Sequence, residues 1–139
     1  MIKGYTSGAM DLLHAGHLLH LKTCREQCDF LIVGLHVDPS IETPGKLEPI
    51  ETTEERLIRL EGCRYVDQVI IYHTEAEQSK LLAELKPDIR FKGGDHKGEP
   101  CTGHPYKLVF TDRDHNYSTG NLRLRIWDAE KEVKRGDKV

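Results

Sequence analysis

The chain has few of the features that mark membrane, nucleic-acid-binding or disulfide-stabilised proteins. Its formal net charge is only −3 at pH 7, so it has no general attraction for nucleic acid or acidic membranes, and any anion site must be local. No apolar run approaches the roughly 20 residues of a membrane span, and no signal peptide precedes Ile2. The four cysteines are too few for a dense disulfide framework. We therefore expect a cytoplasmic protein without nucleic-acid or membrane partners.

Internal repeats and interdomain linkers are also absent from the 139 residues, which fit one domain with a single core. Hydrophobic residues make up 37% and charged residues 31% of the chain, as in a globular protein. The composition changes at the end, where Ala129 to Val139 is highly charged and is expected to fray. The sequence therefore predicts a domain over 1–128 and a charged C-terminal tail over 129–139.

Strand-like and helix-like patterns alternate along the chain. Phe30 to Leu35 is a continuous apolar run, typical of a buried parallel strand, and Thr52 or Thr53 can cap the helix that follows. This alternation predicts a doubly wound, five-stranded parallel sheet with helices on both faces and ligands at the carboxyl ends of the strands. The predicted strands cover 2–6, 30–35, 66–72, 89–92 and 108–111, and the predicted helices 17–28, 52–63, 79–85 and 118–127.

The stretch from Gly8 to His17 lies where the first strand turns into the first helix. A helix N-terminus presents unpaired N–H groups and a partial positive charge, which suit a phosphate group. His14 and His17 are three residues apart, so both rings lie on one helix face. Gly16 has no side chain and lets a ligand approach the backbone. The stretch favours stabilisation of a phosphoryl group, although solvated or capping histidines would give the same pattern.

Polar residues also follow the other predicted strands. Asp38 follows the second strand, Gly93–Asp95 follows the fourth, and Arg113, Ser118 and Thr119 follow the fifth. Each has an alternative explanation, because Asp38 could be a turn residue, the glycine pair a tight bend and Ser118 a helix N-cap. In a parallel sheet, however, all of them converge on one edge.

Three segments together resemble a known family. DLLHAGH over 11–17 resembles the HxGH motif of the cytidylyltransferase-like nucleotidyltransferases, small relatives of the class I aminoacyl-tRNA synthetases. KPDIRFKGGD over 86–95 resembles the segment that forms their base pocket, and RDHNYST over 113–119 is similar to their RTEGISTT triphosphate motif. Residues 55–57 and 64–67 also resemble the second helix of the family and the strand after it. The resemblance covers nearly the whole chain and implies a Rossmann-like fold and a nucleotidyltransferase that releases pyrophosphate.

The expected reaction needs no strong general base. A phosphate monoester has a second pKa near 6 and is its own nucleophile at neutral pH, so the enzyme must position the reactants and neutralise charge. His14 and His17 would stabilise the α-phosphate region. Lys46 and Arg113 would balance the triphosphate charge, and hydroxyls after Arg113 would hold the β- and γ-phosphates. The other predicted nucleotide-binding residues are Gly8, Ala9, Asp11, Gly16, Asp38, Lys92, Gly93, Asp95, Ser118 and Thr119.

The resemblance also implies an acceptor site and a cation. Arg56 and Arg64 would bind the acceptor, although both could instead form ordinary surface ion pairs. Mg²⁺ is expected to bridge the phosphates, and no protein ligand for a metal is predicted, because Asp11 is expected to hold the turn of the motif. Relatives of this size are commonly homodimers, so we expect a homodimer.

The substrates are less sharply indicated. Three departures from the family pattern, at Ala15, His115–Asn116 and Gly120, put the acceptor and the base in doubt. The length, the 14–38 segment and Arg64–Asp67 look most like glycerol-3-phosphate cytidylyltransferase, which predicts CTP and a small phosphorylated alcohol or sugar. The segment KGGDHK over 92–97 instead resembles KGGDYK of the adenylyltransferase that makes ADP-heptose, so the alternative is ATP with a heptose-phosphate-like sugar phosphate.

Two explanations of another class depend on histidine and cysteine. His96, Cys101, His104 and His115 could collect zinc in a non-catalytic module, but their spacing matches no standard site. Cys24 and Cys28 are at helical spacing and do not form a C-x-x-C redox pair.

Overall fold

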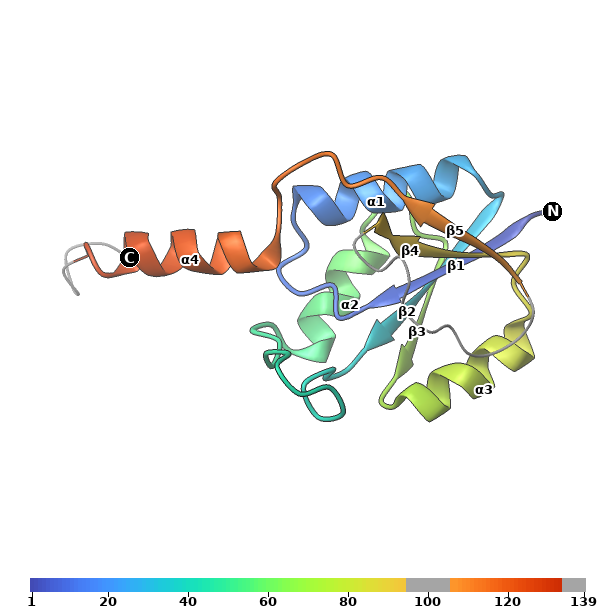
Figure 1. Cartoon of the computed structure of the whole chain (residues 1–139), viewed down its shortest axis with the longest axis horizontal. Helices are drawn as coiled ribbons and strands as arrows, with labels where there is room; N and C mark the ends of the chain where they lie inside the picture. Colours follow the sequence, from blue (N-terminus) through green and yellow to red (C-terminus); the bar gives the residue numbers. More distant parts are fainter. Residues whose placement is uncertain (95–105, 134–139) are drawn as a thin grey trace.

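The computed structural model describes residues 1–94 and 106–133. Over these ranges strands and helices alternate as the sequence predicts (Figure 1). In chain order the elements are β1 Lys3–Gly8, α1 Ala15–Glu26, β2 Phe30–His36, α2 Thr53–Glu61, β3 Gln68–Tyr72, α3 Glu75–Leu85, β4 Ile89–Gly93, β5 Lys107–Thr111 and α4 Thr119–Glu130.

The strands form one parallel sheet in the order β3-β2-β1-β4-β5. The chain winds outward from β1 through β2 to β3, then crosses to β4 and β5. The doubly wound parallel sheet is therefore confirmed. The winding direction reverses between β1 and β4, and in this class of sheet ligands bind outside the carboxyl ends of the strands at such a point.

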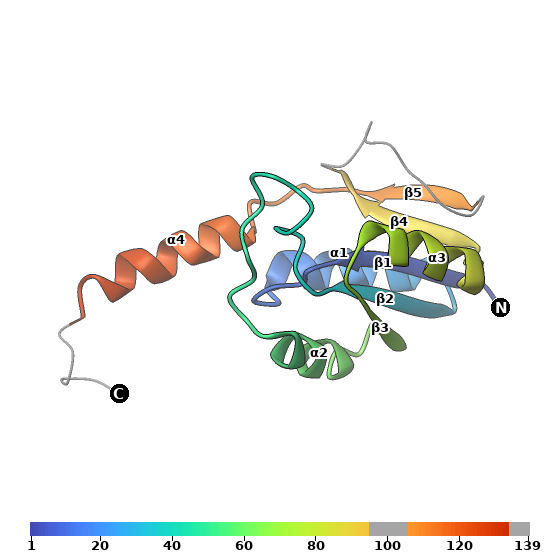
Figure 2. The same cartoon turned by 90° about the horizontal axis from the view of Figure 1, so that it is seen from below.

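Both faces of the sheet are covered. Alternate residues of β2 point to opposite faces, so Leu31 and Val33 join the core under α1 and α2, while Ile32 joins the smaller core under α3. Figures 1 and 2 show α1 and α2 on one side of the sheet and α3 on the other. This double burial explains why β2 is a continuous apolar run.

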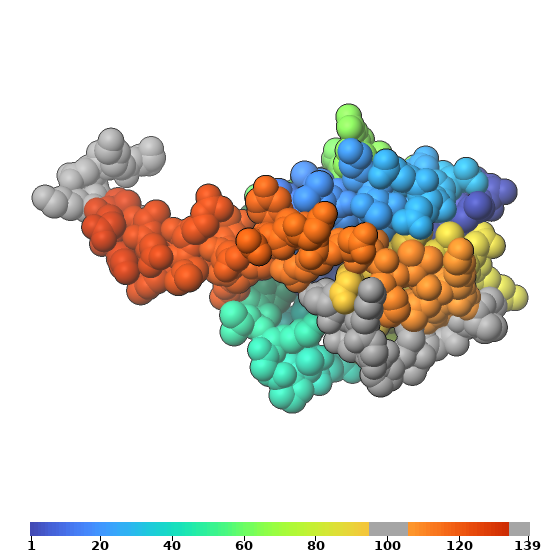
Figure 3. Space-filling view, turned by 45° about the horizontal axis from the view of Figure 1, so that its top comes forward, coloured from blue at the N-terminus to red at the C-terminus, as the bar shows by residue number. Residues whose placement is uncertain are grey.

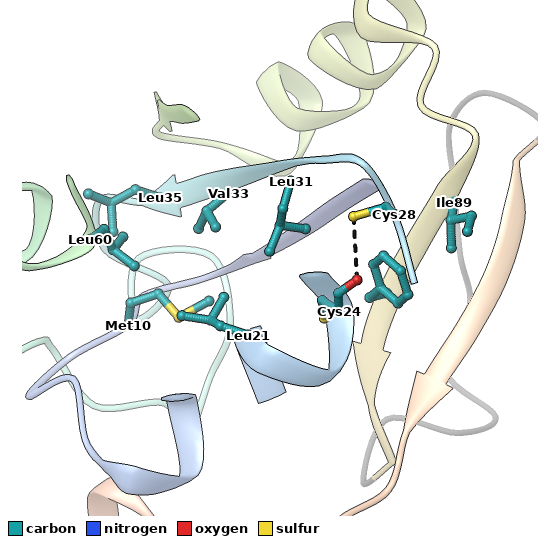
Figure 4. Packing of buried hydrophobic residues seen from close by; sticks show 10 residues of the cluster. Met10, Leu21, Cys24, Cys28, Leu31, Val33, Leu35, Leu60 and Ile89 are labelled. Atoms are coloured by element: carbon teal, nitrogen blue, oxygen red, sulfur yellow. Dashed lines mark hydrogen bonds between the residues drawn. The ribbon is translucent and has the colours of Figure 1, made fainter. Parts of the chain in front are cut away.

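Two cysteines belong to the larger core. Figure 4 shows Cys24 and Cys28 among its aliphatic side chains, where the Cys28 thiol donates a hydrogen bond to the Cys24 carbonyl oxygen at 3.4 Å. Burial raises the pKa of both thiols, so neither is a reactive thiolate at neutral pH. The pair is part of the packing, and the structure gives the redox explanation no support.

Some bounds differ from the predicted ones. α3 begins at Glu75, four residues early, because the Thr74 side chain caps it by accepting the Glu77 backbone N–H at 3.1 Å. β3 begins at Gln68 because the backbone N–H of Val66 is used in a turn, where it donates to the carbonyl of Cys63.

The last helix stands apart from the sheet. α4 continues to Glu130, past the predicted end at Trp127, and none of its residues is buried. Figure 1 shows it projecting away from the body of the molecule. Within the two described ranges, no helix has the length and apolar character that a membrane span requires.

Candidate active site

A strained turn joins β1 to α1. Met10 and Leu12 have φ angles of 52° and 51°, in the left-handed region that side chains other than glycine rarely adopt. The Asp11 carboxylate accepts the backbone N–H groups of Ile50 and Glu51, both at 2.9 Å. The Glu51 carboxylate in return accepts the N–H of Leu12 at 2.7 Å. This exchange fixes the turn, so Asp11 has the structural role that was expected of it.

His14 and His17 cap the helix that they begin. His14 is the N-cap of α1, and its Nδ1 accepts the backbone N–H of Gly16 at 3.1 Å. The Nδ1 of His17 accepts the backbone N–H of His14, also at 3.1 Å. The two rings stack with their centroids 3.9 Å apart. Because each Nδ1 is an acceptor, each neutral ring has its proton on Nε2.

Both rings are neutral at physiological pH. Burial lowers the pKa of His17 to about 3, and His14 and His20 contribute to this shift. Burial also lowers the pKa of His14, and the nearby His115 and Arg113 lower it further. The α1 N-terminus therefore carries two N–H donors without a full positive charge.

The N-terminus of α4 meets the N-terminus of α1. Ser118 caps α4, and its hydroxyl oxygen accepts the backbone N–H of Asn121 at 3.0 Å. The next residue, Thr119, has its Oγ1 3.1 Å from Nε2 of His14. Each helix contributes a partial positive charge at this point, and the caps accept only some of its first N–H groups. Two such ends side by side form a strong anion site.

Arg113 adds a full positive charge near these helix ends. Its Nη2 donates to the Tyr117 carbonyl at 3.2 Å, and it lies close enough to His14 to lower the pKa of that ring. The structure therefore brings together five of the predicted residues, His14, His17, Arg113, Ser118 and Thr119.

His115 is a further residue of this site, although the sequence analysis named it only as a departure from the triphosphate motif and as a member of the candidate zinc set. A Cβ atom added to Gly16 would lie 3.0 Å from Cε1 of both His115 and His14. The absence of a side chain at Gly16 thus makes room for two rings, and the close approach of a ligand to its backbone stays a prediction. The Nδ1 of His115 accepts the N–H of Tyr117 at 3.1 Å, which leaves Nε2 as its donor. Its position inside the 113–119 motif was the available signal.

Glycines end the two central strands at the switch point. Gly8 is the last residue of β1 and Gly93, after Lys92, is the last residue of β4. A Cβ atom on Gly94 would lie 2.8 Å from the Thr111 carbonyl oxygen, so a larger residue would push β4 and β5 apart. Asp95 lies outside the described residues.

Two predicted nucleotide-binding or catalytic residues have local roles in the loop after β2. The Asp38 carboxylate accepts the backbone N–H and the hydroxyl of Ser40, at 2.9 and 2.5 Å, which is the turn-residue alternative. Lys46 is exposed in the same loop, where its backbone N–H donates to the Thr43 carbonyl.

Arg56 has a structural role in place of the acceptor contact that the resemblance implies. Its side chain is only 2% exposed. The guanidinium donates to the carbonyls of Ala9, His36 and Val37 at 2.9, 2.8 and 2.6 Å. It therefore ties β1, β2 and α2 together and is not open to an acceptor. Burial lowers its pKa, an effect that Asp11 and Glu51 oppose.

Arg64 lies at the opposite end of the strands from the histidines. It precedes β3, so it is at the amino ends of the strands, whereas the histidines are at the carboxyl ends. Its guanidinium donates to the Tyr65 hydroxyl at 2.9 Å and lies over that ring. It is not part of the site described above.

Three members of the candidate zinc set, His96, Cys101 and His104, lie outside the described residues. Among residues 1–94 and 106–133, no group of three His, Cys, Asp or Glu side chains could hold a metal ion.

The fold and the site together define a doubly wound α/β protein with a candidate anion site where two helix N-termini meet. The family model described as cytidylyltransferase-like matches residues 5–107. The chain belongs to this family of nucleotidyltransferases, as the resemblance of its motifs implied. The match ends before the 113–119 motif, so the part of the site contributed by that motif is known from the structure.

Curated relatives are longer than this chain. The bifunctional protein HldE of Campylobacter concisus is 34% identical over 134 residues, which cover 94% of this chain and 28% of the relative. HldE of Helicobacter hepaticus is 37% identical over 121 residues, which cover 85% and 25%. The chain thus spans about a quarter of the length of these relatives.

Solved structures agree on the fold. The lipopolysaccharide core biosynthesis protein from Thermoplasma volcanium superposes with a TM-score of 0.67 and 27% identity, over 85% of this chain and 99% of that one. Pantothenate synthetase from Thermus thermophilus gives a TM-score of 0.62 over 94% of this chain and 64% of that one, but at 16% identity it is evidence for the fold alone.

Proposed function

We propose that this protein transfers the adenylyl group of ATP to the phosphate of a phosphorylated sugar and releases pyrophosphate. The observation that carries the proposal is the meeting of the α1 and α4 N-termini through His14 and Thr119. In the reaction, an oxygen of the acceptor phosphate forms a bond to the α-phosphorus. The bond from that phosphorus to the α,β-bridging oxygen breaks, and its electron pair leaves with pyrophosphate.

ATP and a sugar phosphate replace the expected CTP and glycerol-3-phosphate-like acceptor as the preferred pair. The relatives named HldE cover most of this chain, and they support the adenylyltransferase alternative better than the use of CTP. A lipopolysaccharide core is built of sugars, so the match to a lipopolysaccharide core biosynthesis protein also favours a sugar acceptor. The KGGDHK segment points the same way. The sugar itself is proposed only as a class, resembling a heptose phosphate.

The neutral histidines fit the charge change of this reaction. Negative charge builds up on the α-phosphate and on the bridging oxygen as the bond to pyrophosphate breaks. Donors aimed at that charge stabilise the transition state. The Nε2–H groups of His14 and His17 would supply such donors, with a phosphate oxygen taking the place of the Thr119 hydroxyl on His14. The orientation of both rings is fixed in advance by the backbone N–H groups on Nδ1.

The remaining charge belongs to the β- and γ-phosphates. The Arg113 guanidinium can pair with two phosphate oxygens at once. Ser118 and Thr119 would add hydroxyls and the backbone N–H groups of the α4 N-terminus. Lys46, Asp38, Lys92, Gly93 and Asp95 remain predicted nucleotide contacts.

Mg²⁺ is expected to enter with the triphosphate. Magnesium keeps several water and phosphate oxygens as ligands, so it needs few from the protein. Asp11 does not fit as a ligand, because both its oxygens accept backbone N–H groups. The oxygen donors of the described site are the hydroxyls of Ser118 and Thr119. When bound, the cation would neutralise phosphate charge.

A substrate panel tests this proposal. Purified protein with Mg²⁺ is given ATP, CTP, UTP or GTP together with sugar phosphates or glycerol 3-phosphate, and pyrophosphate release is measured. We expect release with ATP and a sugar phosphate, and none when the acceptor lacks phosphate. Faster release with CTP and glycerol 3-phosphate would restore the other substrate pair. A homodimer and a cytoplasmic location remain expectations.

A further inference from the structure

The two halves of the sheet separate at the edge that carries the site. β1 pairs with β2 along all six of its residues. With β4 it pairs only through Gly4–Ile89 and Tyr5–Arg90 within these described strands, so the pairing ends before Thr6. The histidines follow β1, whereas the 113–119 motif follows β5, which pairs with β4. The relative position of these two parts of the site therefore depends on side chains.

The ring of His20 connects these two parts. His20 lies on α1, three residues after His17 and on the same helix face. Its Nε2 is 2.9 Å from Oγ1 of Thr6 in β1, and its Nδ1 is 2.8 Å from Oγ1 of Thr111 in β5. Thr111 is the last residue of β5, two before Arg113. Figure 3 shows β5 and the segment after it, in orange, against α1, in blue. One ring thus joins the helix of the histidines to both halves of the sheet.

The two threonines extend these contacts to the main chain of β4. The Thr6 hydroxyl oxygen is 3.1 Å from the Phe91 carbonyl oxygen, and the Thr111 hydroxyl oxygen is 3.5 Å from that of Lys92. Thr6 is 1% and Thr111 is 4% exposed, so water does not compete for these hydrogen bonds and the low local dielectric strengthens them. A neutral imidazole has one donor and one acceptor, so one hydroxyl accepts from the ring and the other donates to it.

We propose that His20 is a positioning residue of the active site. Both of its ring nitrogens face protein hydroxyls, so it acts through other residues. Through Thr111 it sets where the 113–119 motif begins relative to His14 and His17. The donors for the α-phosphate and the contacts for the β- and γ-phosphates are thereby held at the spacing that the transition state needs. A misplacement of about 1 Å can cost about 10²-fold in rate. The inference rests on the proposed adenylyl transfer.

Steady-state kinetics of H20L and H20Q separate positioning from packing. Leucine keeps an apolar side chain on the helix but removes both ring nitrogens, and each threonine retains its β4 carbonyl, so the chain still folds. The substrate contacts remain in H20L, but their alignment in the transition state is lost. We therefore expect kcat to fall at least about tenfold and the KM for ATP to change less than about threefold. Glutamine has an amide that both donates and accepts, so H20Q should regain most of kcat.

A double variant tests whether His20 acts through Thr111. T111V removes the hydroxyl from a side chain of nearly the same shape and should also lower kcat. Because the ring and the hydroxyl form one link, H20L/T111V should be no slower than H20L, whereas independent effects would multiply. T23V is the matched control, because the Thr23 hydroxyl on the same helix donates to the Leu19 carbonyl at 2.9 Å, outside this network. It should leave kcat unchanged.

A contact in the unliganded protein gives a readout that does not depend on the reaction. Thr119 touches the His14 ring, so a nuclear Overhauser effect should connect the His14 ring protons to the Thr119 methyl group. H20L should weaken this effect, and T23V should preserve it. If the original protein transfers no nucleotidyl group, the proposed reaction fails, and this contact alone decides whether His20 positions the motif.

Four results would each overturn the positioning role. They are a full kcat in H20L, an unchanged effect between His14 and Thr119 in H20L, single losses that multiply in the double variant, and an H20Q variant as slow as H20L. A lower melting temperature of H20L with a full kcat would leave the ring only a part in packing.

Discussion

His14 and His17 each use Nδ1 to hold the fold. The Nε2 atom of each ring is the donor for a ligand, and in the unliganded chain that of His14 faces the Thr119 hydroxyl at 3.1 Å. Nδ1 accepts a backbone N–H, and Nε2 holds the proton. Because burial lowers the pKa of both rings, they act as hydrogen-bond donors in the unliganded protein and not as fixed cations. The capping and phosphate-binding explanations of the motif are therefore compatible.

The two functions of His14 can be separated by substitution. An asparagine amide oxygen can take the place of Nδ1 and keep the cap, but it removes the Nε2–H. H14N should lower kcat by about 10²–10³, the effect of losing one transition-state donor, with little change in melting temperature. His14→Ala should lose both activity and stability, because the cap is worth about 1 kcal/mol. Near-normal turnover of H14N would remove this ring from the mechanism.

Acid should destabilise the fold through His17. Its pKa is about 3 in the folded chain and near 6.5 when unfolded. Between these values only the unfolded chain takes up the proton, so stability is complete above pH 6.5 and falls as the pH drops toward 3. The slope from one such proton is about 1.4 kcal/mol per pH unit. Urea unfolding from pH 7 to 4 measures it.

H17N should flatten that dependence, because the titrating ring is gone. H73N is the control for loss of an exposed histidine outside the histidine cluster, where His73 pairs with Glu77. It should change the slope less than H17N does. Equal slopes for H17N and the original protein would show that His17 has the same pKa in the folded and the unfolded chain.

At the scale of elements, the strands follow from local sequence and much of the site does not. Apolar runs such as Phe30–Leu35 identify a strand because burial on both faces leaves a local pattern. The start of α3 was predicted too late because its first turn, Glu75–Gln78, has no apolar residue except Ala76. The histidine motif was found by its spacing. The Asp11–Glu51 exchange joins residues 40 apart, which no local pattern reveals.

The contacts of Arg56 depend on tertiary packing, so the local sequence could not predict them. R56L should lower the free energy of unfolding by about 3 kcal/mol or more, because it leaves several buried carbonyls without donors. An acceptor-binding arginine would instead raise the KM for the acceptor with little loss of stability. Urea unfolding and acceptor KM, measured on the same variant, distinguish the two. Unchanged stability with a raised acceptor KM would return Arg56 to the acceptor site.

At the scale of the whole molecule, α4 leads from the site away from the sheet (Figure 1). Its first residue, Thr119, contacts His14, and its second half, around Trp127, is exposed. The sequence indicated the helix, but its projection from the sheet depends on where β5 ends and could not be foreseen.

The central claim is that the acceptor phosphate attacks the α-phosphorus of ATP at this site. Its most direct test labels the acceptor phosphate with ¹⁸O and follows the products by ³¹P NMR. The mechanism predicts isotope shifts on both phosphorus atoms of the product diphosphate, because the labelled oxygen becomes the bridge, and no shift in pyrophosphate. An unshifted α-phosphorus in the product would mean that another oxygen attacks, which would contradict the mechanism.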